Sequence, residues 1–152
     1  IQPNLPAEEN IRQLCFQKEG FLFDEFKNIF ADLFNNKSEN YEKIVRALAG
    51  GSLELNDIYL ALGVKKSGKI SKYLNDLILS GFVARDYKWN IKEGKESKLS
   101  QYRLNDNYLR FYLKLISPHK SKIERDEFTE RSLYSLPGWD TVMGLQFENL
   151  VI

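Results

Sequence analysis

Cysteine, histidine and methionine each occur only once in this chain of 152 residues. The single cysteine, Cys15, cannot form a disulfide within the chain, and we expect it to be a small buried hydrophobic residue. The single histidine, His119, has no cluster of ligand-type residues at metal-binding spacing around it, so a structural or solvated role is expected. The sequence therefore predicts no nucleophile constellation, no catalytic residue and no metal site.

Long apolar runs are also lacking, since none approaches the roughly 20 residues that a membrane span needs, and no signal peptide is visible. No Gly-x-x-x-x-Gly-Lys-Ser/Thr motif occurs, and Ser67-Gly68-Lys69 is too short a piece to form an ATP site. We therefore expect a cytoplasmic protein with no membrane contact and no cofactor bound by these residues. Because the sequence starts at Ile1 and stops inside an apolar periodicity, we expect a fragment of a longer protein.

The composition that is present is typical of a globular protein, with 43% hydrophobic and 13% aromatic residues. The formal net charge is only +1, but charge is unevenly distributed along the chain. The segment from Lys65 to Arg103 contains ten Lys and Arg residues and four Asp and Glu residues, so its net charge is +6 and that of the remainder is −5. A basic segment of this kind favours a polyanionic partner.

The centre of the basic segment is a predicted helix over residues 67–80. Its start is marked by Ser67, a good N-cap residue, and its end by Gly81, which can adopt a left-handed turn. Apolar residues recur at i, i+3, i+4, i+7 and i+8, which predicts one buried face formed by Ile70, Tyr73, Leu74, Leu77 and Ile78. Lysines gather before the helix and on its first turns, outside that face: Lys65, Lys66, Lys69 and Lys72.

Three further helices are predicted before this one. An aromatic stripe at helical spacing runs from Phe23 to Phe34, and a second helix follows, with Asn36 and Glu39 at the spacing of a capping box. Its apolar face holds Tyr41, Ile44, Val45, Leu48 and Ala49. The next segment, 53–63, is predicted as a short helix that Gly63 ends and that Glu54 starts less well than a Ser or Thr would. A short turn joins it to the helix at 67–80, which is the pattern of a helix-turn-helix.

A β-hairpin is predicted after the helix at 67–80. Residues 82–89 alternate and are rich in strand formers, residues 90–99 form a polar tip around Gly94, and residues 100–104 return as a second strand. The predicted fold class is therefore mainly α with a small β-hairpin wing, a winged helix-turn-helix flanked by extra helices.

Two helices are predicted after the wing. The first, 108–116, is apolar nearly all round and is expected to end at Pro118; residues 120–138 read as a linker. The second begins at Asp140, and its apolar face (Trp139, Val142, Met143, Phe147, Leu150 and Val151) is expected to lack a partner in this chain. The predicted domains are an N-terminal helical segment (1–37), the winged helix-turn-helix (38–106), a helix and linker (107–137) and the start of a further domain (138–152).

Several short motifs together carry a resemblance to a known family. They are Leu48-Ala49-Gly50-Gly51, Ser71-Lys72-Tyr73-Leu74, Tyr102-Arg103-Leu104-Asn105-Asp106 followed by Leu109-Arg110-Phe111, and Gly144-Leu145-Gln146-Phe147-Glu148. In this order they resemble the C-terminal half of the prokaryotic, archaeal-type AAA ATPases over roughly residues 20–152. Phe111-Tyr112 departs from the Phe-Trp that is usual in that family.

The resemblance implies that 1–37 is the end of an ATPase region and that 138–152 starts a restriction-endonuclease-like domain. It implies ATP and Mg for the full-length protein, which is then an ATPase, with the missing ATPase core and nuclease-like domain as partners in the same chain. Glu148 resembles a helix glutamate of the nuclease-like domain, but it forms no site alone. This chain itself is expected to be catalytically silent and is a possible homo-oligomer.

Two functions remain open. In the first, the chain is a DNA-binding module whose helix at 67–80 enters the major groove and whose wing at 82–104 contacts phosphates. In the second, it is an interaction module that couples the ATPase core to the nuclease-like domain. We place DNA binding ahead because of the basic segment. The expected DNA-binding residues are Lys65, Lys66, Ser67, Lys69, Ser71, Lys72, Asn75, Lys88, Lys92 and Lys95.

Overall fold

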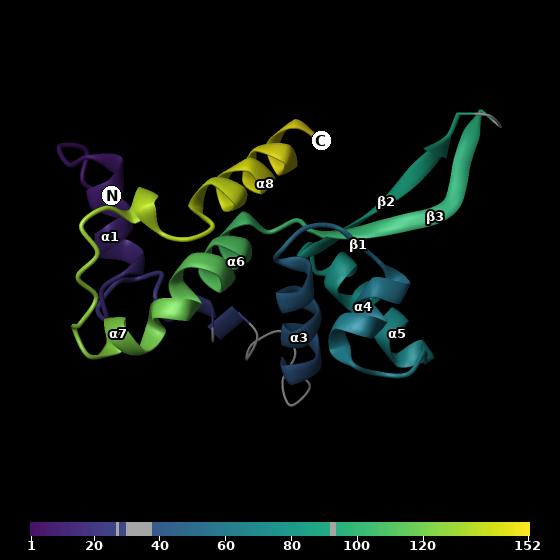
Figure 1. Ribbon diagram of the computed structural model, residues 1–152, viewed down its shortest axis with the longest axis horizontal. Helices are drawn as coiled ribbons and strands as arrows, with labels where there is room; N and C mark the ends of the chain where they lie inside the picture. The colour runs from purple at the N-terminus through teal and green to yellow at the C-terminus, as the bar shows by residue number, and fades with distance from the viewer. Residues whose placement is uncertain (27, 30–37, 92–93) are drawn as a thin grey trace. The chain divides into compact units, whose positions relative to one another are not determined.

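The computed structural model describes residues 1–26, 28–29, 38–91 and 94–152 (Figure 1). These residues form a mainly helical chain with one small antiparallel sheet, which confirms the predicted fold class. They divide into two compact units: an inserted unit, Phe34–Asn107, and a split unit formed by Ile1–Leu33 together with Tyr108–Ile152. The second half of the predicted aromatic helix, the capping residue Asn36 and Lys92 lie outside the described residues, and the domain boundaries drawn from the sequence stay predictions.

The inserted unit has the element order of a winged helix-turn-helix. In chain order its elements are α3 (Ser38–Leu48), β1 (Leu53–Glu54), α4 (Leu55–Leu62), α5 (Gly68–Leu79), β2 (Val83–Asn90) and β3 (Lys95–Leu104). The strands form an antiparallel sheet in the order β1-β3-β2. The β2–β3 hairpin extends well beyond the helices of this unit (Figure 1).

The strand β1 differs from the sequence prediction, which assigned residues 53–63 to a single helix. Leu53 pairs with Tyr102, and Glu54 pairs with Gln101, so the first two residues complete the sheet before α4 begins. Glu54 still starts the helix effectively, because its backbone N–H donates to Asp57 Oδ2 at 3.2 Å. A carboxylate three residues into a helix satisfies a donor that the helix itself leaves free.

The turns around α5 follow the sequence pattern with one exception. Gly63 (φ 64°) and Gly81 (φ 80°) adopt the left-handed conformation after α4 and α5, as predicted. Ser67 occupies the N-cap position of α5, but its side chain forms no capping hydrogen bond. Instead, the Tyr59 hydroxyl donates to the carbonyl oxygen of Ser67 and accepts from its N–H, which ties the turn to α4.

The core of the inserted unit collects the apolar faces of three helices and the base of the sheet. On α5 the buried residues are Ile70, Leu74 and Leu77, while Tyr73 and Ile78 of the predicted face are half-buried. They meet buried residues of the other elements: Tyr41, Ile44, Val45, Leu48, Ala49, Ile58, Tyr59, Phe82, Val83, Tyr102 and Leu104. Since the apolar side of α5 is buried, its opposite side faces solvent.

The split unit is built from helices at both ends of the chain. They are α1 (Ala7–Cys15), α6 (Asn107–Phe111), a π-helical turn (Tyr112–Ile116), a 3-10 turn (Ser117–His119), α7 (Lys120–Glu124), a second 3-10 turn (Leu133–Ser135) and α8 (Trp139–Val151). The helical path does not end at Pro118, contrary to the prediction. Pro118 lies in the first turn of the 3-10 segment, where a missing N–H costs little, and α7 follows directly.

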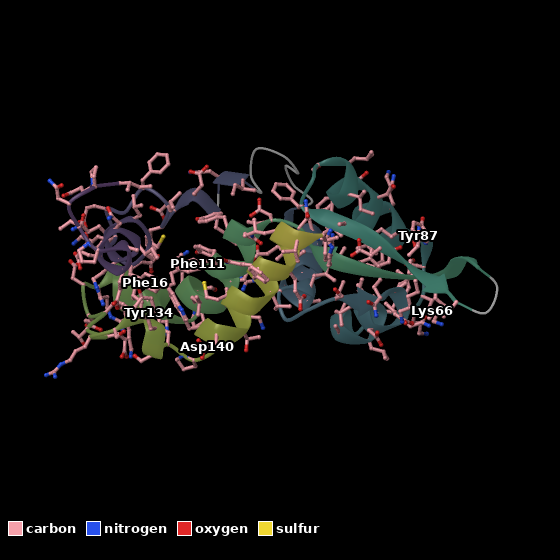
Figure 2. All side chains as sticks on the ribbon, turned by 90° about the horizontal axis from the view of Figure 1, so that it is seen from above. Phe16, Lys66, Tyr87, Phe111, Tyr134 and Asp140 are labelled. Atoms are coloured by element: carbon pink, nitrogen blue, oxygen red, sulfur yellow. The ribbon has the colours of Figure 1, made fainter. Side chains whose placement is uncertain are left out.

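Aromatic contacts hold the two chain segments of the split unit together. Phe16 stacks on Phe128 with ring centroids 5.0 Å apart. It also meets the edge of Phe111 at a centroid distance of 6.3 Å (both residues are labelled in Figure 2). Phe26 stacks on Tyr112 at 4.3 Å. Burial raises the pKa of the Cys15 thiol to about 11, which fits the expected role of Cys15 as a small hydrophobic residue.

The apolar face of α8 is partly covered, which corrects the expectation that all of it lacks a partner. Trp139 and Val142 are buried, and the Trp139 ring contacts Phe111 and Tyr134 at centroid distances of 5.9 and 5.2 Å. The buried Arg110 guanidinium donates from Nη1 to the Leu145 carbonyl oxygen at 3.1 Å. Only the second half of the face is exposed: Phe147, Leu150 and Val151. None of the described helices has the length and hydropathy of a membrane span.

Replacing Leu74 by alanine is expected to destabilise the inserted unit by about 2–5 kcal/mol, because it opens a cavity at a fully buried site. Leu79→Ala is the matched control, since Leu79 lies on the same helix with 79% of its surface exposed. Denaturant titration measures both free energies of unfolding. A loss below about 0.5 kcal/mol for Leu74→Ala contradicts the assigned core face.

Tyr41 joins α3 to α5 through its hydroxyl, which donates to Asp76 Oδ2 at 2.7 Å. Burial, and then this hydrogen bond, raise the pKa of Tyr41 from 10.0 to about 12. The protonated form therefore contributes stability that is complete below pH 10 and lost as the pH rises toward about 12.

Tyr41→Phe is accordingly expected to cost about 1.5 kcal/mol at neutral pH, the lower end for a hydrogen bond to a charged group. The difference from the parent should shrink at alkaline pH, because above pH 10 Tyr41 ionises in the unfolded parent before it ionises in the folded parent, which favours unfolding of the parent alone. Unfolding titrations at pH 8 and pH 11 measure this, with the exposed Tyr134→Phe as control. An equal difference at both pH values contradicts the role of the hydroxyl.

Candidate nucleic-acid interface

The solvent-facing side of α5 carries three of the residues predicted to bind DNA. Lys69, Lys72 and Asn75 are all exposed and follow one another at intervals of three residues. On a helix this spacing places Lys69 and Lys72 on the side away from Leu74, with Asn75 at the edge of the row, where it lines a crevice together with Leu74. The structure therefore brings them together as predicted, on an element fixed by its buried face.

The lysines of this region are not neutralised by nearby carboxylates. Within the described part of the chain, no ion pair involves Lys65, Lys66, Lys69 or Lys72. Several lysines elsewhere are paired, for example Lys43 Nζ with Glu39 at 2.7 Å on α3. The positive charge at the start of α5 is thus available to an external anion.

The turn before α5 presents the first two lysines beside an apolar hollow. Lys65 and Lys66 are exposed and border a hollow of about 380 Å³ together with Tyr59, Leu60 and Val64 (Lys66 is labelled in Figure 2). Ser67 is exposed, but its backbone is held by the Tyr59 hydroxyl. Charged and apolar surface therefore lie next to each other at this corner.

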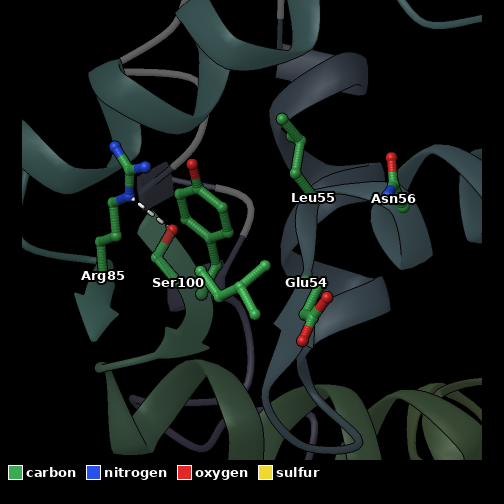
Figure 3. A pocket seen from close by; sticks show the side chains of 7 residues that line it. Glu54, Leu55, Asn56, Arg85 and Ser100 are labelled. Atoms are coloured by element: carbon green, nitrogen blue, oxygen red, sulfur yellow. Dashed lines mark hydrogen bonds between the residues drawn. The ribbon is translucent and has the colours of Figure 1, made fainter. Parts of the chain in front are cut away.

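A polar crevice separates α5 from the sheet. It has a volume of about 200 Å³. Its polar lining is Ser71 and Asn75 on the helix side and Arg85 and Tyr102 on the sheet side, and its apolar lining is Leu55, Leu74 and Ile78. Arg85 Nε donates to Ser100 Oγ at 2.9 Å (Figure 3). Its guanidinium carbon lies 4.9 Å from the Tyr87 ring centroid and 5.5 Å from that of Tyr102.

Arg85 is absent from the sequence-predicted site, although its planar guanidinium suits bidentate contact with a phosphate better than a lysine ammonium does. The alternation of residues 82–89 could have indicated it, because Arg85 shares a strand face with Val83, which is buried. Its position opposite Tyr102 depends on the strand register, which the sequence does not reveal.

Of the predicted wing lysines, Lys88 alone has a side chain within the described part of the structure. Lys88 Nζ forms an ion pair with Glu54 Oε1 at 2.6 Å, so its charge is already balanced in part. Lys95 lies at the start of β3, but its side chain is outside the described part of the structure, as is all of Lys92. The described ranges also contain no group of three or more His, Cys, Asp or Glu side chains that could hold a metal ion.

Comparison with known proteins gives one similarity to report. Over 110 residues the chain is 33% identical to Uncharacterized protein MJECL04 of Methanocaldococcus jannaschii. The alignment covers 72% of this chain and 24% of that relative, so it spans about a quarter of the relative's length. No protein-family model and no solved structure matches the chain. The resemblance to AAA ATPases therefore stays a prediction.

Single substitutions should show that unpaired lysines of the predicted interface contribute more to DNA affinity than lysines held in an ion pair. Lys72→Gln is expected to weaken binding of a duplex DNA several-fold, whereas Lys88→Gln should change it less than twofold, since Lys88 is held by Glu54. Fluorescence anisotropy of a labelled duplex at low salt measures both affinities. Equal losses for the two variants contradict the distinction between them.

Proposed function

We propose that the inserted unit binds duplex DNA through the exposed side of α5, and that the chain is a non-catalytic module of a larger ATPase. The observation that carries the DNA proposal is the row of unpaired cations and an amide on a helix whose opposite side is locked into the core. Such a helix is rigid, amphipathic and positively charged where it meets solvent. These are the properties of helices that enter the major groove.

The chemistry of the row sets the expected mode of binding. Lys69 and Lys72 supply point charges for phosphates, while the Asn75 amide can both donate to and accept from a base edge. Because lysine gives little base readout, most of the affinity is electrostatic. We expect dissociation constants near ~10⁻⁴–10⁻⁶ M at physiological salt, with a steep salt dependence.

A second candidate function is protein interaction, and exposed apolar residues near both ends of α5 favour it. Leu60 on α4 and Leu79 on α5 each expose 79% of their surface, and Val64 exposes 44%. In the longer protein implied by the AAA ATPase resemblance, this surface is proposed to contact the ATPase core or the nuclease-like domain. ATP and Mg then belong to that core and not to the residues described above.

The double substitution Lys69→Glu/Lys72→Glu tests the DNA proposal. It is expected to abolish detectable binding to a random-sequence duplex at low salt, because it replaces two attractive charges by two repulsive ones. The matched control is Lys114→Glu/Lys122→Glu, which makes the same change in net charge at two exposed lysines of the split unit.

Anisotropy titrations at several salt concentrations supply the measurement, and circular dichroism shows that each variant is folded. Equal binding by the α5 double variant and the parent refutes the proposed face. If the parent itself does not bind duplex DNA at low salt, the protein-interaction function is favoured.

A further inference from the structure

We propose that the crevice between α5 and β2 holds one phosphate group of the bound duplex, with Arg85 as its principal ligand. This inference rests on the proposed function and adds a specific contact outside the residues on α5. It gives the sheet a role in binding that does not depend on the wing lysines.

The Arg85 guanidinium is held in place before any ligand arrives. Its Nε donates to Ser100 Oγ, and its face lies over the rings of Tyr87 and Tyr102. These contacts use Nε and the π surface and leave the two terminal nitrogens for a ligand. Among the described residues, no carboxylate pairs with this guanidinium. A fixed guanidinium loses little entropy when it binds an oxyanion.

The crevice supplies further polar groups at the opposite wall. Ser71 and Asn75 lie one helical turn apart on α5 and line the same space as Arg85. The Ser71 hydroxyl can donate to a phosphate oxygen that the guanidinium leaves free, and the Asn75 amide at the same wall remains for the base edge. A space of about 200 Å³ is large enough for a single phosphate group.

The local charges agree with an anionic ligand. Glu54 lines a second hollow that also borders Arg85 (Figure 3), but its carboxylate pairs with Lys88 at 2.6 Å. On the helix side, Lys72 lies between Ser71 and Asn75 in sequence and carries an unpaired charge. The phosphate in the crevice is therefore proposed to come from the DNA strand that runs next to Lys69 and Lys72 on α5.

Replacing Arg85 by glutamine and by lysine should have different consequences, because glutamine removes the charge whereas lysine keeps the charge and removes the planar guanidinium. Arg85→Gln removes one phosphate contact, so the slope of log K against log salt should fall in magnitude by about 0.9. Arg85→Lys keeps the charge and hence the slope, but loses the bidentate geometry, so affinity should drop roughly tenfold at constant salt. Arg85 is exposed, so both variants are expected to fold.

Tyr87 is a positioning residue in this proposal, because it touches Arg85 and not the phosphate. Tyr87→Leu should weaken binding about threefold while leaving the salt slope unchanged, since the charge remains but is no longer held by the ring. A merely structural effect would lower the unfolding midpoint as well. Thermal unfolding followed by circular dichroism provides that readout.

The experiment compares salt titrations of duplex binding for the parent, the Arg85 variants and Arg46→Gln. Arg46 is the matched control, an exposed arginine of α3 that pairs with Glu42 at 2.7 Å, and its loss should leave the slope unchanged. An unchanged slope in Arg85→Gln, or parental affinity in Arg85→Lys, overturns the assignment of Arg85.

The two proposals fail in different ways. If Lys69→Glu/Lys72→Glu abolishes binding while Arg85→Gln keeps the parental slope, the DNA function stands and the crevice assignment is wrong. If the parent binds no duplex, both are wrong. If the Arg85 variants lose affinity and the α5 double variant does not, the phosphate site stands and the α5 face is wrong.

Discussion

The burial of Ile70, Leu74 and Leu77 determines which side of α5 meets solvent, and the candidate interface depends on it. These three side chains lie in the same core as α3 and the base of the sheet, so the helix cannot turn about its axis without exposing them. A rotation would cost several kcal/mol at each site, by the usual scale for buried leucine and isoleucine. The row that includes Lys72 is therefore presented in one orientation only.

The surfaces of the inserted unit differ in whether their charged side chains form ion pairs, more than in how many charged side chains they carry. On α3, Lys43 and Arg46 each meet a glutamate one turn away, and on the sheet Lys88 meets Glu54. Exposed pairs of this kind contribute little to stability, but they reduce the local potential. The turn before α5 and its first turns have no such partners among the described residues, so the potential there is the sum of several like charges.

The helices of the inserted unit could be predicted from the apolar periodicity and from two glycines, because local sequence determines where such helices form and end. Features that depend on contacts between distant parts of the chain could not be predicted in this way. Strand β1 exists only because Leu53 finds Tyr102, about fifty residues away, and a two-residue strand has no periodicity. The crevice requires the same register, since it places Arg85 opposite Tyr102 and beside α5. The positions of the lysines are known from the sequence, but the ion pair between Lys88 and Glu54 could not be predicted from it.

The split unit is assembled from segments that flank the inserted unit in the chain. Phe16 finds Phe128, and Arg12 donates to the carbonyl oxygens of Glu130 and Arg131, more than a hundred residues downstream. During synthesis, α1 therefore emerges from the ribosome long before its partners exist, whereas the inserted unit is complete once residue 107 has emerged. The inserted unit can fold first, whereas α1 keeps its apolar face exposed until residues 111–131 have been synthesised. A chaperone can bind that exposed face during this interval.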